Sequence, residues 1–265
     1  MPARREDAAP FPLFDLPPEA VELVLGCVDN LTDKRALRLV CKQTRASVDS
    51  RVVAVKGARW PPQPLGEQQL SALVQAPWQL QRLYLSGREL GDPDASALAA
   101  ATWHSLQVLS RSHNSLGPAG AASLAAAHLP SLQELWLNGN NLGPAGAASL
   151  AAAAWPALRE LRLGWNSLGD AGAASLAAAA WPSLWVLDLW RNSLGPSSAA
   201  ALAAAHFPAL QWLVLDHNSL GDAGAASLAA AHFPALQTVS LSVNGISGEG
   251  RALLQARWPT ARIDV

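Results

Sequence analysis

Three histidines recur at one position of an internal repeat, and this spacing could place metal-ligating imidazoles in register. His128, His206 and His232 are separated by multiples of 26 residues. The same column holds Ala154 and Ala180 in other copies, and no cysteine or carboxylate accompanies the histidines, as a zinc site would require. We therefore expect exposed histidines at helix ends and no metal site.

Patterns for nucleophilic catalysis or phosphate binding are missing from the sequence. It contains neither a Gly-x-Ser-x-Gly elbow nor a Gly-x-x-x-x-Gly-Lys-Ser/Thr loop. Cys41 lies in a helical pattern without a neighbouring base that would activate its thiol. We expect no catalytic residues and no cofactor.

A repeat with a period of 26 residues organises most of the chain. One copy reads Leu132-x-x-Leu135-x-Leu137-x-x-Asn140-x-Leu142-Gly143, followed by Gly146, Leu150 and Pro156. The asparagine recurs at 26-residue intervals as Asn114, Asn140, Asn166, Asn192, Asn218 and Asn244. An earlier copy begins at Leu80 and has Arg88 in place of the asparagine, which makes seven copies. Because no single copy can bury its own apolar face, the copies must stack.

Each copy predicts a strand, a turn and a helix. The leucines alternate at period two, which indicates a short strand, and an Ala-rich segment follows and ends before a proline. The asparagine amide can satisfy backbone groups of the turn and of the neighbouring coil. Aromatic residues before the proline are predicted to fill the core, namely Trp155, Trp181, Phe207 and Phe233. The sequence offers no account of Arg111, which stands in an inward leucine column.

Over about residues 65–265 the chain resembles the leucine-rich-repeat family. The run Leu168, Gly169, Asp170, Gly172 and Leu176 is similar to the cysteine-containing subfamily common in F-box proteins. Asparagine stands where that subfamily usually has cysteine, as in the ribonuclease-inhibitor-like subfamily, so the subfamily stays open. The resemblance implies an α/β solenoid that is curved, with parallel strands on its concave face and Ala-rich helices on its convex face. Residues 80–265 would form the repeats, ending in a shortened copy and a C-terminal cap.

The N-terminal residues follow a different pattern. Residues 1–12 are polar and contain prolines, so we expect a disordered lead over 1–14, whereas apolar spacing in 15–50 predicts short helices. The pattern opens with Leu16-Pro17-x-Glu19 and closes with Leu39-Val40-Cys41-Lys42-x-x-Arg45. It resembles the F-box, a helical module that binds the Skp-type adaptor of a cullin-based ubiquitin ligase. Thr44 departs from the tryptophan that the family often has there.

The F-box resemblance implies a set of adaptor-binding residues. They are Leu16, Pro17, Leu23, Leu25, Leu39 and Val40. The alternative is a helical cap that only covers the open end of the solenoid. In either case residues 51–79 are expected to supply a linking strand, at 51–56, and an N-terminal capping coil.

The outward columns of the predicted strands carry candidate binding residues. Trp136, Trp190 and Trp212 stand out because tryptophan is a frequent interface anchor and has no packing role on an exposed column. Their alternative role is stabilisation of the sheet through contacts between neighbouring strands. The predicted partner-binding residues are Tyr84, Glu134, Trp136, Arg162, Asp188, Trp190, Trp212 and Asp216.

Composition narrows the partner class and the compartment. The net charge is −1, which favours neither nucleic acid nor an anionic membrane. The uncharged stretch 114–133 contains glycines and prolines and recurs in register, so we expect no membrane span. With two cysteines the chain suits a reducing compartment, the cytoplasm or the nucleus or both, and we expect a monomer outside any complex.

Three functional hypotheses remain. The first, implied by the resemblance, is a substrate-recognition adaptor of a Skp-cullin-F-box ubiquitin ligase, non-catalytic itself, that binds a protein substrate on the concave face for degradation. The second is a free-standing scaffold or inhibitor resembling the ribonuclease-inhibitor class. The third is a regulator of a small GTPase, which no particular residue supports.

Overall fold

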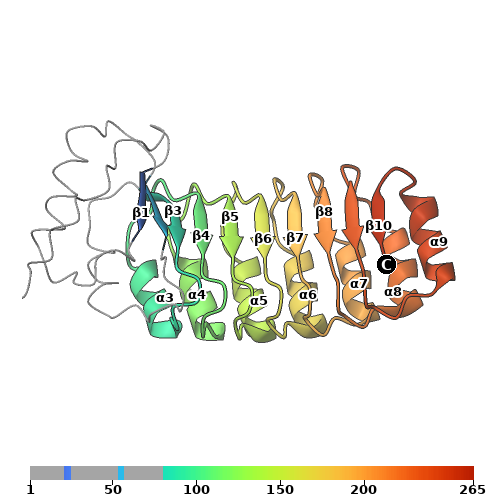
Figure 1. Cartoon of the computed structure of the whole chain (residues 1–265), viewed down its shortest axis with the longest axis horizontal. Coiled ribbons are helices and arrows are strands. Elements are labelled where there is room, and N and C mark those ends of the chain that lie inside the picture. The colour runs from blue at the N-terminus through green and yellow to red at the C-terminus, as the bar shows by residue number, and fades with distance from the viewer. Residues whose placement is uncertain (1–20, 25–52, 57–79) are drawn as a thin grey trace, which may run out of the picture.

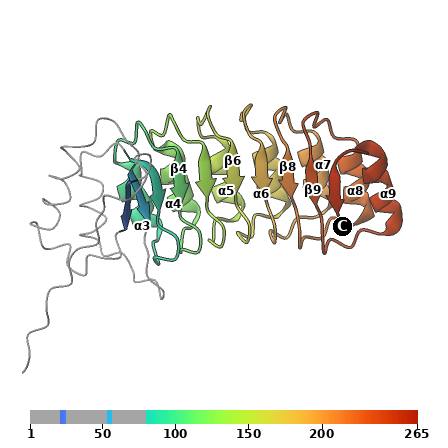
Figure 2. The same cartoon turned by 45° about the horizontal axis from the view of Figure 1, so that its top comes forward.

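The protein is a solenoid in which each coil contributes one strand and one helix. The computed structural model describes residues 21–24, 53–56 and 80–265. Within these ranges ten parallel strands form one sheet in chain order, from β1 to β10. The helices form a second layer on one side of the sheet (Figures 1 and 2). Among the described residues no helix lies on the opposite side of β3–β10 (Figure 1), and we call this side the strand face.

The elements recur at the spacing that the repeat predicts. The strands are β1 (Val21–Val24), β2 (Val53–Lys56), β3 (Leu80–Tyr84), β4 (Val108–Ser110), β5 (Glu134–Trp136), β6 (Glu160–Arg162), β7 (Val186–Asp188), β8 (Trp212–Val214), β9 (Thr238–Ser240) and β10 (Arg262–Asp264). The helices are α3 (Asp92–Ala99), α4 (Pro118–Ala126), α5 (Gly143–Ala151), α6 (Gly169–Ala177), α7 (Pro196–Ala203), α8 (Gly221–Ala229) and α9 (Gly248–Arg257). Through residues 80–265, no helix has both the length and the apolar character needed to cross a bilayer.

The strands keep one register along the repeats. Leu135 of β5 pairs with Leu161 of β6, which pairs with Leu187 of β7, so that each column holds equivalent residues of successive coils. All three leucines are buried between the sheet and the helices. The alternation of inward leucines and outward residues is thereby confirmed.

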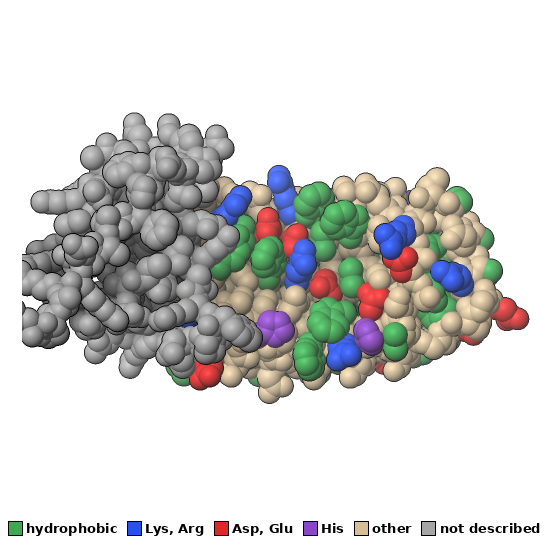
Figure 3. All heavy atoms as spheres, in the orientation of Figure 1, with side chains coloured by type: hydrophobic (Ala, Val, Ile, Leu, Met, Phe, Trp, Pro, Cys, Tyr) green, Lys and Arg blue, Asp and Glu red, His purple; other side chains and the backbone are tan. Residues whose placement is uncertain are grey.

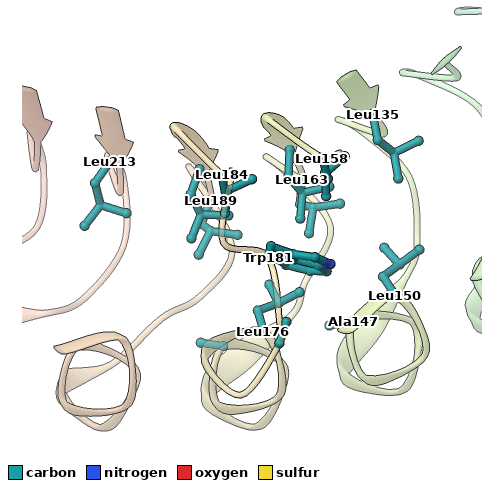
Figure 4. Close-up of a cluster of buried hydrophobic side chains, with 14 of the residues drawn as sticks. Leu135, Ala147, Leu150, Leu158, Leu163, Leu176, Trp181, Leu184, Leu189 and Leu213 are labelled. Carbon is teal, nitrogen blue, oxygen red and sulfur yellow. The ribbon is translucent and has the colours of Figure 1, made fainter. Parts of the chain in front are cut away.

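The core is a continuous stack of leucines with one aromatic side chain in most coils, whereas Leu129 takes that position in one coil. Figure 4 shows Trp181 between the strand-side Leu163 and Leu189 and the helix-side Leu176. The aromatic residues predicted to fill the core are all buried, namely Trp155, Trp181, Phe207 and Phe233. This prediction is confirmed.

The asparagine column joins adjacent coils. The Asn218 Nδ2 group donates to the Leu215 carbonyl oxygen of its own coil at 2.8 Å and to that of Leu189 in the preceding coil at 3.1 Å. Its Oδ1 atom accepts from the Asn192 and Leu194 amides at 2.9 and 3.0 Å. The predicted role of the column in satisfying turn and neighbouring backbone groups is confirmed.

Small residues let the helices approach closely. A Cβ atom on Gly172 would lie 2.9 Å from the Leu168 Cβ atom and 3.2 Å from the Ala147 Cβ atom. A carboxylate also links coils, because Asp170 Oδ1 accepts from the Gly195 amide at 2.7 Å at the start of α7. The hydrogen bond from the Ser198 hydroxyl, together with that from the Gly195 amide, lowers the pKa of Asp170.

Arg111 occupies the inward column that otherwise holds leucine, and it is fully buried. Its Nη2 atom donates to the Gly91 carbonyl oxygen at 3.4 Å. Burial lowers its pKa to about 10, against the opposing attraction of Asp94 and Asp92. The guanidinium therefore stays charged at neutral pH, and the two carboxylates at the start of α3 offset part of the cost of its burial.

One prediction for the N-terminal segment is wrong. Residues 21–24 form strand β1, which pairs in parallel with β2, whereas the sequence analysis expected helix here. The Val-Glu-Leu-Val run alternates apolar and polar residues, and β2 would otherwise present an unpaired sheet edge. Strand β2 lies within the predicted linking strand at 51–56. The rest of the segment 15–50 lies outside the described residues.

Candidate functional site

The strand face gathers the large outward side chains of the repeats. Figure 3 shows apolar, acidic and basic side chains crowded over the central strands, with few on the C-terminal coils. Three groups of side chains lie on this face. They are an exposed tryptophan pair, the indoles Trp136 and Trp190 with their neighbours, and four carboxylates.

All eight predicted partner-binding residues lie on the strand face. Each stands in one of the strands β3–β8 or just after it. Trp212 is exposed, at 46% of its surface, whereas Asp188 is buried, at 9%. The remaining six are half-buried, namely Tyr84, Glu134, Trp136, Arg162, Trp190 and Asp216. The structure brings these residues onto one surface, but only Trp212 has the exposure that the sequence analysis expected of all three tryptophans.

Trp212 is one half of a tryptophan pair that the sequence analysis missed. The ring of Trp185 stacks on that of Trp212 with centroids 6.2 Å apart and an interplanar angle of 11°. Trp185 is 40% exposed. It directly precedes β7 in a column that otherwise holds glutamines and Arg159. An aromatic residue in so polar a column is the feature of the sequence that could have identified Trp185 as exposed. We call Trp185 and Trp212 the tryptophan pair.

Trp136 and Trp190 pack on their neighbours, as the sheet-stabilising alternative proposed. The ring of Trp136 lies 6.0 Å from that of Tyr84, and the Arg162 guanidinium lies 5.3 Å from its centroid. Trp190 lies 6.0 Å from Trp165, a second exposed tryptophan that the sequence analysis missed. Such contacts fix the rings in place before any partner arrives.

Four carboxylates lie among these rings, and we call Glu134, Glu160, Asp188 and Asp216 the acidic row. Glu160 forms an ion pair with Arg162. Asp216 Oδ1 accepts from Ser240 Oγ at 2.7 Å and from the Ser242 amide at 2.9 Å. Burial raises the pKa of Glu134, and the nearby charge of Glu160 adds to this.

Asp188 is the most perturbed member of the acidic row. Burial raises its pKa to about 6, and the charges of Asp216 and Glu160 contribute, while the Trp190 amide and Arg162 oppose the rise. Its Oδ1 atom accepts from the Trp190 amide at 3.1 Å. A cationic group placed here by a partner would relieve the cost of holding this charge.

We expect stability to depend on the protonation of Asp188. Its folded-state pKa lies above the ordinary value of 3.8, so between about pH 6 and about pH 4 the folded chain holds a proton that the unfolded chain releases. The Asp188 contribution to the free energy of unfolding therefore rises as the pH falls through 6. Asp188→Asn should remove this dependence and stabilise the fold by about 2 kcal/mol above pH 7.

Urea unfolding of both proteins at about pH 7.5 and about pH 5 measures this effect. A difference between Asp188→Asn and the unchanged chain that is the same at both pH values would contradict the assignment. Asp170→Asn is a control of opposite sign, because the pKa of Asp170 is lowered and its ionised form stabilises the fold.

The remaining candidates lie away from the strand face or outside the described residues. His128, His206 and His232 are exposed and stand in the loops that follow the helices. Through residues 80–265, no three histidine, cysteine or acidic side chains are grouped so as to hold a metal ion. Of the predicted adaptor-binding residues, Leu23 lies in β1, and the other five lie outside the described residues.

Comparisons with known proteins agree with this architecture. A family model described as a leucine-rich repeat matches residues 128–151 and 156–177. An internalin from Listeria monocytogenes is similar in structure, with a TM-score of 0.51 and 20% sequence identity over 81% of this chain and 60% of the internalin. The chain thus spans less than two thirds of that protein. A search of curated proteins found no match.

Two further solved structures resemble the chain more loosely. A Bacteroides fragilis protein has a TM-score of 0.48 and 13% identity over 88% of this chain and 82% of its own. The Arabidopsis receptor kinase HAESA, solved with a peptide hormone and a co-receptor, has a TM-score of 0.42 and 20% identity over 74% and 34%. The coils, the matched repeats and the likeness to the internalin establish that this chain has the fold of a leucine-rich-repeat solenoid.

Proposed function

We propose that the chain is a non-catalytic recognition protein whose strand face binds a protein partner. The carrying observation is the tryptophan pair, because two stacked indoles expose 40% and 46% of their surfaces where β7 and β8 begin. Large exposed aromatic side chains contribute most to binding free energy when a partner covers them. The acidic row beside them favours a partner with basic side chains at the contact.

We further propose that the bound partner is a substrate presented to a Skp-cullin-F-box ubiquitin ligase. This part rests on the sequence alone, through the opening Leu16-Pro17 and the closing Leu39-Val40 of the F-box-like pattern. Such a protein acts by positioning its substrate, and the other subunits of the ligase carry out the chemistry.

The alternative of a free-standing scaffold or inhibitor also has an observation in its favour. Strand β1 lies inside the F-box-like segment and extends the sheet beyond β2. A segment that covers the sheet edge in this way acts as a cap. Under this alternative the strand face keeps its partner, and residues 15–50 have no adaptor to bind.

Capture experiments with the purified full chain separate the two parts of the proposal. We expect a purified Skp-type adaptor to be retained by the unchanged chain and lost by the double variant Leu16→Ala, Pro17→Ala. We expect crosslinked protein partners to be lost by Trp185→Ala, Trp212→Ala, because each removed indole at a hot spot weakens binding by about 2 kcal/mol or more. The matched control is His206→Ala, His232→Ala, which changes two exposed rings on another part of the coils.

The outcomes of these captures are independent of one another. No adaptor binding by a folded chain would demote residues 15–50 to a cap and leave the scaffold alternative. Equal partner capture by the tryptophan variant and the histidine control would overturn the strand-face assignment.

A further inference from the structure

One column of the turns that follow β3–β9 lies in the left-handed backbone region in all seven copies. Gly87 and Gly139 occupy this column in two coils, with φ values of 65° and 64°. The other five copies carry larger residues there, namely His113 (54°), Trp165 (57°), Arg191 (50°), His217 (54°) and Val243 (58°). Side chains other than glycine adopt this conformation at a cost in free energy, yet most copies have one there, so the turn presents a side chain at this position.

The Trp165 ring and its neighbour form a rigid surface. Trp165 is 53% exposed and its centroid lies 6.0 Å from that of Trp190, at an interplanar angle of 58°. Trp190 lies against the backbone of Gly164, because a Cβ atom there would come within 1.8 Å of the indole Nε1 atom. We call Trp165 and Trp190 the indole shelf.

The guanidinium of Arg191 lies over the indole shelf without an anionic partner. Its Cζ atom is 5.7 Å from the Trp165 centroid and 5.5 Å from the Trp190 centroid. Arg191 is exposed, and among residues 80–265 it forms no ion pair, since the ion pairs there join Arg162 to Glu160 and Arg262 to Asp264. Two aromatic faces thus orient a charged group whose hydrogen-bond donors remain available.

We propose that Arg191 on the indole shelf binds a carboxylate side chain of the protein partner. This proposal rests on the proposed function of the strand face. A guanidinium accepts a carboxylate through two parallel N–H···O bonds, and the indoles hold its plane in position for them. Apolar atoms next to the carboxylate would cover the exposed ring of Trp165.

The charges around the shelf define the recognised segment further. The acidic row lies on the same face, so a polyanion would be repelled there while one acidic side chain can still reach Arg191. The fitting segment therefore carries an Asp or Glu that meets Arg191, with a basic residue nearby that meets the acidic row. An extended peptide can place both groups within a few residues.

Titration of the ¹⁵N-labelled full chain with a short peptide tests the site. The probe is acetyl-Lys-Gly-Glu-Phe-amide, and its matched control has Gln in place of Glu. We expect the indole N–H signals of Trp165 and Trp190 to move saturably with the Glu peptide and the affinity to fall about tenfold with the Gln peptide. Arg191→Gly should cause a similar loss, and glycine suits the backbone at φ 50°. Arg251→Gln, which changes an exposed arginine on α9, should leave the affinity unchanged.

Either of two results would overturn the proposal. The first is equal affinity for the Glu and Gln peptides. The second is a shift of the indole signals by inorganic phosphate that is as large as the shift caused by the Glu peptide at equal concentration. This second result would indicate an unspecific anion site. The test is distinct from that of the proposed function. Partner capture that depends on the tryptophan pair while the peptide fails to bind would reject the shelf alone, and peptide binding without such capture would reject the proposed function alone.

Discussion

Trp181→Ala should lower the free energy of unfolding by about 3 to 5 kcal/mol, because it empties the aromatic position of a coil whose neighbours cannot close the gap. The Trp181 ring is 1% exposed and lies between leucines of the strand and helix layers (Figure 4). Those leucines belong to two adjacent coils held in register by the sheet, which limits their collapse into the cavity. Urea unfolding followed by circular dichroism measures the loss.

Trp181→Phe is the matched control, because the chain itself has phenylalanine at this position in Phe207 and Phe233. The Trp181 Nε1 atom has no hydrogen-bond partner among the described residues, so the smaller ring forfeits no polar contact. We expect a cost below about 1.5 kcal/mol. A loss from Trp181→Ala no larger than that of the control would mean that the coils repack, and it would contradict the picture of a rigid stack.

The solenoid was predictable because every copy repeats the same local pattern. One alternation of leucines, read seven times, predicted the strands, and the asparagine column predicted the links between coils that Asn218 makes. Arg111 was not predictable in the same way. Its compensation comes from Asp92 and Asp94, and only the stacking of two coils brings their charges close to the guanidinium.

The candidate site was predicted as a surface but not in its detail. The outward columns correctly placed Trp136, Trp190 and Trp212 on one face, yet column position does not determine exposure. Trp190 packs against Gly164 because Gly164 lacks a side chain. The burial of Trp190 therefore depends on both residues together and cannot be predicted from either one alone. Trp165 and Trp185 stand in columns flanking the strands, where a search restricted to strand positions does not look.

The N-terminal strand β1 shows where a local pattern misleads. A four-residue segment such as Val21–Val24, in which Glu22 is the one polar residue, suits a strand as well as a turn of helix. The edge of β2 decides between strand and helix, because its backbone N–H and C=O groups pair with all four residues of β1. That edge exists only once the solenoid has formed, so the residues themselves do not encode the choice.

The second large effect is expected for Asn192→Ala, because one amide satisfies four backbone groups of two coils. Its Oδ1 atom accepts from the Asn166 and Leu168 amides at 3.0 and 3.3 Å. Its Nδ2 group donates to the Leu163 and Trp190 carbonyl oxygens at 2.9 and 3.3 Å. The two carbonyl oxygens also accept from the Asn166 Nδ2 group and the Trp165 amide, so only the two amides lose their partner. Each buried group left in this way costs about 1 to 3 kcal/mol, so the variant should lose about 3 kcal/mol in urea unfolding.

The loss should also be local in origin, which a second measurement can detect. Amide hydrogen exchange should accelerate at Asn166 and Leu168, whose N–H groups lose their acceptor, before it does so in distant coils. Asn141→Ala is the matched control, because Asn141 is exposed and adjoins the column without belonging to it, and its removal should change stability by less than about 0.5 kcal/mol. If Asn192→Ala were as mild as this control, water would be able to replace the amide, and the column would serve the turn conformation rather than the joining of coils.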